Sequence, residues 1–131
     1  MSIYKTRWFE RWARKERLGD ANLVRAVEEM SKGLIDVDLG GGLVKKRIGR
    51  RGYGKRGGYR TLLATNRGDR WVFVYGFPKN ERSNIAPAET EALKKLAAQL
   101  LSMSVQAIST AVRSGELLEV HGHAQDAISD S

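Results

Sequence analysis

Apolar residues recur at helical spacing in two stretches near the beginning of the chain. Residues 7–18 predict a helix that places Trp8 and Trp12 one turn apart on the same side. Residues 20–33 predict a second helix with Asp20 as its N-cap. The apolar stripe of this second helix comprises Leu23, Val27, Met30 and Leu34. The two stretches predict a helical hairpin whose apolar side chains, the tryptophans included, belong to the core.

The pattern changes to alternation in the middle of the chain. We expect strands at residues 43–48, 59–65 and 70–77, the last two joined by a tight turn at residues 66–69, after a glycine loop at residues 40–42. Alternation puts Trp71, Phe73, Tyr75 and Phe77 on one face of the third strand, and Val72 and Val74 on the other. Because both faces are apolar, this strand is expected inside the sheet.

Helical spacing returns after Pro87, which is typical of a first helical position. Ser104 predicts the cap of another short helix that Gly115 ends. Residues 117–120 predict either a further strand or simple packing, and a short strand is expected at residues 3–6. The order of strand, helical hairpin, three-strand antiparallel meander and helices predicts an α+β domain over residues 1–120, followed by a flexible tail at residues 121–131.

The charge of the chain is concentrated rather than spread. The net charge is +8 over 131 residues, and residues 45–82 hold twelve Lys or Arg against two acidic residues. Such a field attracts polyanions, nucleic acid first. There is no cysteine, which excludes disulfides and thiol catalysis, and there is no apolar run long enough to cross a membrane. The charged first 17 residues argue against a secretion signal, so a cytoplasmic protein without membrane partners is expected.

Residues 49–58 read GRRGYGKRGG. The run resembles the beginning of a phosphate-binding P-loop, but Arg56 stands where Ser or Thr must bind magnesium, and a strand follows where a helix is needed. It is too short to bind nucleic acid alone. We interpret it as a basic loop beside a site on the sheet, in which Tyr53, Lys55 and Arg56 contact a polyanion. A solvated turn is the alternative.

Three residues outside this loop carry candidate chemistry. Arg60 lies in an apolar strand, where its charge requires an anionic partner such as a phosphate, unless it lies at an edge in water. Lys79 follows the third strand, where sites are often built. Tyr75 can stack on a base and keep its hydroxyl for proton transfer, or it can be a core residue.

The segment GKRGGYR at residues 54–60, followed by YGF at residues 75–77 and KNE at residues 79–81, resembles toxins of the RelE/ParE superfamily. The resemblance is greatest to the RelE-like, HigB-type branch, and it is supported by KTRWF at residues 5–9 and DLGGGLVKKR at residues 38–47. It covers residues 3–101, with residues 102–120 as an extension. It implies a helical hairpin on a small twisted sheet, cleavage of mRNA on the ribosome, and neutralisation by a cognate antitoxin, often a helix-turn-helix DNA-binding protein.

RNA cleavage through the 2′-hydroxyl needs a base, an acid and cations that stabilise the phosphorane. With histidine confined to the tail, Lys or Tyr must transfer protons, and a Lys among cations has a lowered pKa. The resemblance and this chemistry assign catalysis to Lys55, Arg60, Tyr75 and Lys79. They assign RNA binding to Lys45, Lys46, Arg50, Arg51, Tyr53, Arg56 and Arg82. No metal or other cofactor is expected. The alternatives are a ParE-like toxin that poisons gyrase and an inactive nucleic-acid-binding module.

Overall fold

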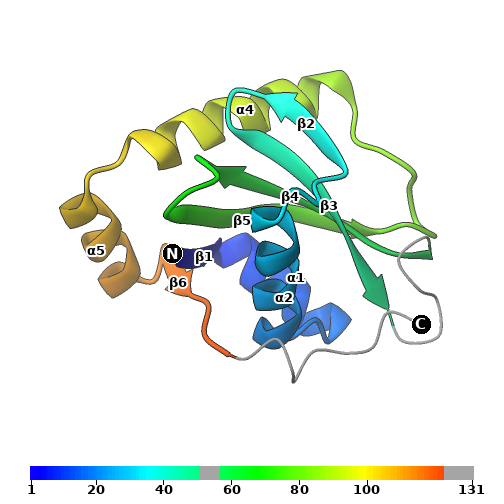
Figure 1. The fold of residues 1–131 in the computed structure, drawn as a ribbon, viewed down its shortest axis with the longest axis horizontal. Helices are drawn as coiled ribbons and strands as arrows, with labels where there is room; N and C mark the ends of the chain where they lie inside the picture. Colours follow the sequence, from blue (N-terminus) through cyan, green and yellow to red (C-terminus); the bar gives the residue numbers. More distant parts are fainter. Residues whose placement is uncertain (51–56, 123–131) are drawn as a thin grey trace.

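The computed structural model describes residues 1–50 and 57–122 and has an α+β architecture (Figure 1). The elements in chain order are β1 (Ser2–Thr6), α1 (Arg7–Glu16), α2 (Asp20–Ser31), β2 (Val37–Gly40), β3 (Leu43–Arg50), β4 (Gly58–Thr65), β5 (Arg70–Pro78), α4 (Pro87–Ser102), α5 (Val105–Ser114) and β6 (Leu117–Glu119). The predicted α+β class, the helical hairpin near the beginning and the later helices are confirmed.

One sheet of six strands organises the described residues, in the order β2-β3-β4-β5-β1-β6. The predicted antiparallel meander is present as β3, β4 and β5. β1 pairs in parallel with β5 and antiparallel with β6, so the sheet is wider than the meander alone. The prediction missed β2, whose four residues include only two apolar side chains and two glycine or acidic positions.

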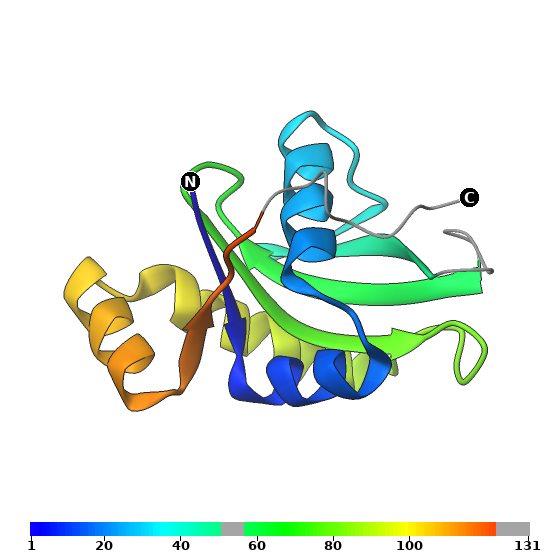
Figure 2. The ribbon, with the colours of Figure 1, turned by 90° about the horizontal axis from the view of Figure 1, so that it is seen from below.

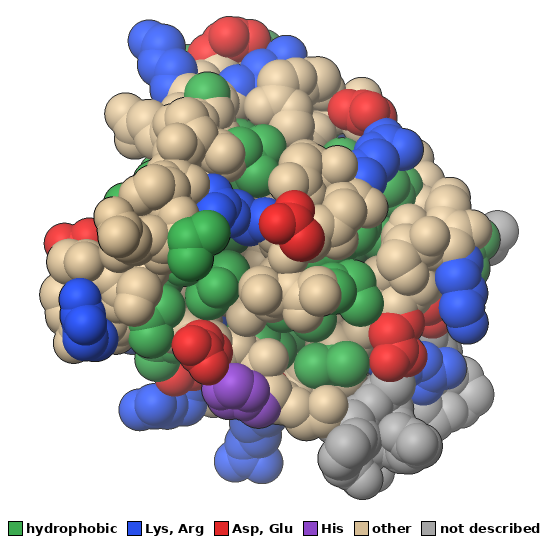
Figure 3. Space-filling model, turned by 60° about the vertical axis from the view of Figure 1, so that its left-hand side comes forward, with side chains coloured by type: hydrophobic (Ala, Val, Ile, Leu, Met, Phe, Trp, Pro, Cys, Tyr) green, Lys and Arg blue, Asp and Glu red, His purple; other side chains and the backbone are tan. Residues whose placement is uncertain are grey.

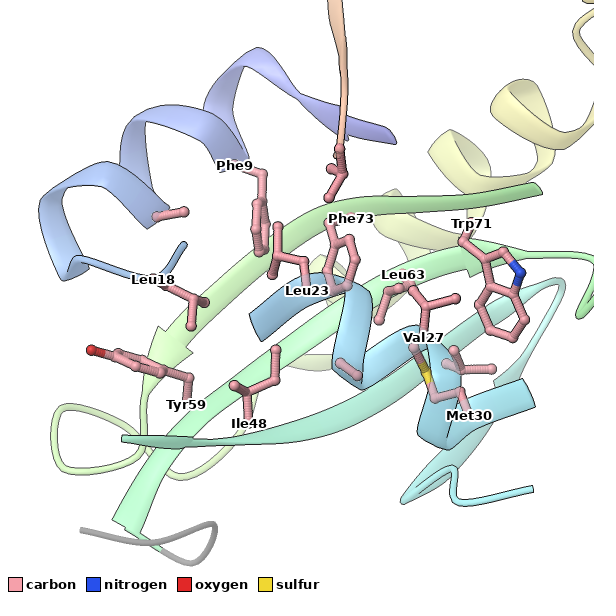
Figure 4. Packing of buried hydrophobic residues seen from close by; sticks show 14 residues of the cluster. Phe9, Leu18, Leu23, Val27, Met30, Ile48, Tyr59, Leu63, Trp71 and Phe73 are labelled. Atoms are coloured by element: carbon pink, nitrogen blue, oxygen red, sulfur yellow. The ribbon is translucent and has the colours of Figure 1, made fainter. Parts of the chain in front are cut away.

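A hydrophobic core lies on each face of the sheet. The ribbon shows α2 on one side of the sheet and α4 on the other (Figure 2). On the first face, which we call the hairpin face, α1 and α2 pack against the sheet (Figure 4). Phe9, Leu23 and Val27 of the helices meet Leu63 and Phe73 of the strands there, all of them fully buried. On the second face, the α4 face, α4 covers residues of β3, β4 and β5, and α5 packs against β6. The sheet is therefore the middle of three layers.

A bulge in β5 changes the predicted faces of that strand. Leu63 pairs with Phe73, but the next pair is Leu62 with Tyr75, so Val74 is an extra residue opposite β4. Alternation is interrupted at that point. Trp71 and Phe73 belong to the hairpin-face core, whereas Tyr75 and Phe77 belong with the α4-face cluster. The prediction of one shared aromatic face was therefore wrong.

Local contacts explain where the helices begin and end. The Thr6 side chain accepts a hydrogen bond from the Phe9 N–H at 3.2 Å and caps α1. Ser104 caps α5 as predicted, and Gly115 ends it in the left-handed conformation. Asp20, predicted as an N-cap, is instead the first residue of α2, after Gly19.

The carboxylate of Asp20 belongs to a partly buried ion network around Lys5. It lies 2.7 Å from the Lys5 ammonium, which also lies 3.0 Å from Glu10. Burial alone would lower the pKa of Lys5, but the hydrogen bonds to Asp20 and Glu10 raise it above its usual value. Because the three residues belong to β1, α1 and α2, the network ties the helical hairpin to the sheet.

Candidate nucleic-acid interface

Alternation in β3 and β4 places three cations on the α4 face of the sheet. Arg47 pairs directly with Arg60, and Lys45 pairs with Leu62 one step along. The same rows continue onto β5, because Arg60 pairs with Phe77 and Leu62 with Tyr75. Residues paired across neighbouring strands share a face. Lys45, Arg47, Arg60, Phe77 and Tyr75 therefore form one surface, which we call the cationic row.

Mutual repulsion and burial alter the acidities in this row. Arg60 is only 5% exposed, and burial followed by the nearby Arg47 lowers the pKa of its guanidinium, against a raising effect of Asp36. Burial also lowers the pKa of Lys45, and the charges of Arg60 and Arg47 lower it further. A phosphate placed here would relieve this repulsion. The lowered pKa thus falls on Lys45, whereas the sequence reasoning concerned Lys79 and Lys55.

Lys79 reaches the row from the end of β5. Its backbone N–H donates to the Gly58 carbonyl at 2.9 Å, which holds the end of β5 against the beginning of β4. Its charge is among those that lower the pKa of Lys45. The structure therefore brings together Arg60, Lys79 and Tyr75, three of the four predicted catalytic residues.

The Tyr75 hydroxyl lies at a polar clamp between β5 and α4. Arg82 donates to this hydroxyl at 3.4 Å and binds both oxygens of Glu89, at 2.7 and 3.2 Å. Glu89 also accepts from the Ala86 N–H and caps α4. The hydrogen bond from Arg82, followed by the one from Ala86, lowers the pKa of Glu89. Arg82, predicted to bind RNA, is thus engaged in holding Tyr75 and the helix together.

Two of the predicted RNA-binding residues lie on the hairpin face instead. Lys46 is 3% exposed, and its ammonium lies 2.8 Å from Glu29 and donates to the Leu34 carbonyl at 2.9 Å. The Arg50 guanidinium lies over the Tyr59 ring, 5.6 Å from its centroid. Both residues are an odd number of positions from Lys45, so the pleat turns them to the other side. Burial and pairing of the Lys46 side chain argue against the prediction that it binds RNA.

Four predicted site residues, Arg51, Tyr53, Lys55 and Arg56, lie outside the described residues. Their assignments stay predictions.

Sequence reasoning missed other members of the site. Asp36 accepts from the Arg47 N–H at 2.6 Å, and Asn84 accepts from the Lys45 ammonium at 3.1 Å. Glu89 comes from the next helix. The sequence shows few acids between residues 45 and 82, but Asp36 and Glu89 fold in from either side of that segment. Arg47 was detectable, because it lies two residues from Lys45 in the same strand and shares its face.

The excess of positive charge in the cationic row is not found over the whole surface of the described residues. On the end of the molecule that carries α5 and β6, Lys or Arg and Asp or Glu side chains are interspersed (Figure 3). In the cationic row and its clamp, five cations (Lys45, Arg47, Arg60, Lys79, Arg82) face two carboxylates (Asp36, Glu89). The surplus of positive charge favours a ligand with several negative charges.

Within the described residues, no cluster of three or more His, Asp or Glu side chains is arranged to hold a metal ion. No helix in the described part of the chain is long and apolar enough to cross a membrane.

The fold and this row define a small α+β protein with a strongly basic sheet face. A family model described as the RelE toxin of the RelE / RelB toxin-antitoxin system matches residues 1–120. The chain therefore belongs to the RelE toxin family, which confirms the superfamily resemblance seen in the sequence. A comparison with curated proteins gave no match.

Proposed function

We propose that this protein inhibits translation by cutting mRNA that is bound to the ribosome. The observation that carries the proposal is the cationic row, in which Arg60 and Lys45 lie on one sheet face with Tyr75. Binding of a polyanion alone does not require a half-buried lysine with a lowered pKa in the same cross-strand row as a tyrosine. Perturbed titratable groups that lie together are typical of catalytic sites.

The reaction assigns a step to each group. A lysine in its neutral form takes the proton of the ribose 2′-hydroxyl, and the 2′-oxygen attacks the adjacent phosphorus. The bond from phosphorus to the 5′-oxygen then breaks, and an acid gives that oxygen a proton. The products are a 2′,3′-cyclic phosphate and a free 5′-hydroxyl. The lowered pKa of Lys45 makes it a base candidate beside Lys79, with Tyr75 as the acid.

Arg60 and Arg47 stabilise the charge that develops on the phosphorane oxygens. Because Arg60 is almost fully buried, its charge acts in a region of low dielectric and is already in place before the reaction. Lys55 in the loop outside the described residues stays a further candidate for proton transfer. The ribosome would position the message, which supplies the orientation that a small open surface lacks.

The partners follow from this activity. The family pairs each toxin with an antitoxin, and we propose that the antitoxin here is a helix-turn-helix DNA-binding protein, as the HigB-type resemblance implies. Action on ribosomes also places the toxin in the cytoplasm.

The test is induced expression in a bacterial host, with primer extension on an abundant mRNA. The wild type should arrest growth and produce new cuts within translated frames. The variant with both Arg60→Ala and Lys79→Ala should produce none, and a message without a start codon should stay intact. Arg113→Ala is the matched control, because Arg113 is an exposed cation on α5. Growth arrest without cuts would contradict the proposal and favour a gyrase-type target.

A further inference from the structure

Trp8 is an exposed aromatic residue where a core residue was expected. It belongs to the first turn of α1 and is 46% exposed. Its ring stacks on that of Tyr75, with centroids 4.7 Å apart and planes 27° apart. The bulge in β5 turns Tyr75 to the α4 face, toward the cationic row. Trp8 therefore extends the aromatic surface of the candidate site beyond the edge of β5.

The Trp8 ring is held in place before any ligand arrives. It also stacks with Trp12, with centroids 6.2 Å apart and planes 11° apart. Trp12 in turn makes edge contacts with Phe9 and Tyr59, both buried in the hairpin-face core. A rigid, preorganised ring loses little entropy when a ligand stacks on it.

Cations and tryptophans form two adjacent rows along the outer side of α1. With 3.6 residues per turn, Arg7, Arg11, Arg14 and Lys15 fall on one side of the helix, Trp8 and Trp12 fall beside them, and the buried residues follow. The four cations line an open hollow of about 500 Å³ between α1 and the turn before β6, with Glu10 as its acidic member. Glu10 is already paired with Lys5 and Arg14.

Trp8 thus lies between two positive surfaces, the cationic row on the sheet and the cations of α1. Phosphates bind cations and bases stack on aromatic rings, so alternating cations and aromatics fit a nucleic acid strand better than an acidic peptide. We propose that Trp8, together with Tyr75, is a stacking site for an unpaired base of the RNA strand that is cut, and that the α1 cations bind the phosphates beside that base. This inference rests on the proposed function and adds a subsite to it.

The test measures binding without cleavage. The first probe is a short single-stranded RNA with 2′-O-methyl riboses, which cannot be cut through the 2′-oxygen. The second probe is an otherwise identical strand whose residues are abasic. The chain has three tryptophans, and Trp71 is fully buried, so fluorescence quenching reports mainly on the α1 pair. We expect Trp8→Ala to weaken binding of the base-containing strand about tenfold, since base stacking on an aromatic side chain is typically worth that much or more.

The variants separate stacking from charge and from folding. Trp8→Phe keeps an aromatic ring and should bind nearly as tightly as the wild type. Binding of the abasic strand should not respond to Trp8→Ala, whereas Arg11→Gln should weaken both strands equally. Leu34→Ala is the matched control, because Leu34 is also exposed and apolar but lies before β2. Thermal unfolding of each variant shows whether it is folded.

Equal effects of Trp8→Ala on the two strands, or no effect, would overturn the proposal. So would unchanged RNA binding combined with lost binding of the antitoxin, because Trp8 would then serve a protein partner. Cleavage is assayed separately in a translation reaction. If wild-type protein binds RNA in a base-dependent way but cuts nothing there, the nuclease proposal fails and the stacking site stands.

Discussion

The side chains of Lys45 and Lys46, neighbours in the chain, lie on opposite faces of the sheet. Lys45 belongs to the cationic row and donates to Asn84, whereas Lys46 is buried against Glu29 under the helical hairpin. The two lysines have the same charge and are adjacent in the same basic segment. Their substitution should nevertheless affect different properties of the protein.

Lys45→Ala should lower RNA cleavage about a hundredfold or more and leave the free energy of unfolding nearly unchanged, if Lys45 transfers a proton. Lys46→Ala should lower that free energy by about 2–3 kcal/mol, because it leaves the Glu29 carboxylate partly buried without its nearest cation. Urea denaturation and a translation-coupled cleavage assay on both variants measure the two effects. If the two variants lost similar amounts of cleavage activity and had equal free energies of unfolding, the different roles given to Lys45 and Lys46 would be contradicted.

As the pH rises, RNA binding should begin to weaken at a lower pH than it would if Lys45 had the usual lysine pKa. The Lys45 pKa lies below its usual 10.5, so the side chain begins to lose its charge at a lower pH, and with it the attraction to phosphate. In Lys45→Arg the charge persists, since arginine stays protonated. Titration of the 2′-O-methyl RNA between about pH 7 and pH 10 should show a fall in affinity for the wild type that this variant lacks.

Arg82 and Glu89 should act on catalysis through the Tyr75 hydroxyl. Glu89→Gln weakens the clamp, and its effect on kcat should largely disappear in a Tyr75→Phe background, where the hydroxyl is already absent. The coupling between the two substitutions should reach about 0.5–3 kcal/mol in a double-mutant cycle. Independent effects that simply add would show that the clamp only supports α4.

The same clamp predicts how stability depends on pH. The folded pKa of Glu89 lies below its usual 4.5, so its contribution is present above that pH and is lost as the pH falls through the folded value. In Glu89→Gln this part of the acid sensitivity should be missing from unfolding curves measured at decreasing pH.

Gly76→Ala should destabilise the protein by about 1–3 kcal/mol. A Cβ at this position would lie 2.5 Å from the Trp12 ring, which must then move out of its contacts with Phe9 and Tyr59. Gly68→Ala is the control, because its Cβ meets only the Asn66 side chain, at 3.6 Å. Equal stability of both variants would show that the ring adapts without cost.

Local patterns predicted the elements well because each depends on its own residues. Ser104 and Gly115 fix α5, and the pleat of β4 correctly placed Arg60 with Leu62 on one face. The failures concern partners that are distant in sequence. No local pattern shows that β5 has an extra residue opposite β4, which reverses the face of Tyr75 and brings it to Trp8.

The candidate site was predictable in part for the same reason. Charge density identified the segment that supplies Lys45, Arg60 and Lys79. It did not indicate which cations are buried in ion pairs, because Glu29 and Asp36 come from other elements. The acidic partners decide which lysines of a basic segment stay available to a ligand.

The inner position of β1 in the sheet affects the order in which the sheet can fold during synthesis. Tyr4 of β1 pairs with Val72 on one side and with Glu119 on the other. The sheet is thus incomplete until nearly all of the described residues have been synthesised. Pairings this distant along the chain also slow folding, because a long loop must close first. β6 can close this edge of the sheet only after the strands that carry the cationic row have been synthesised.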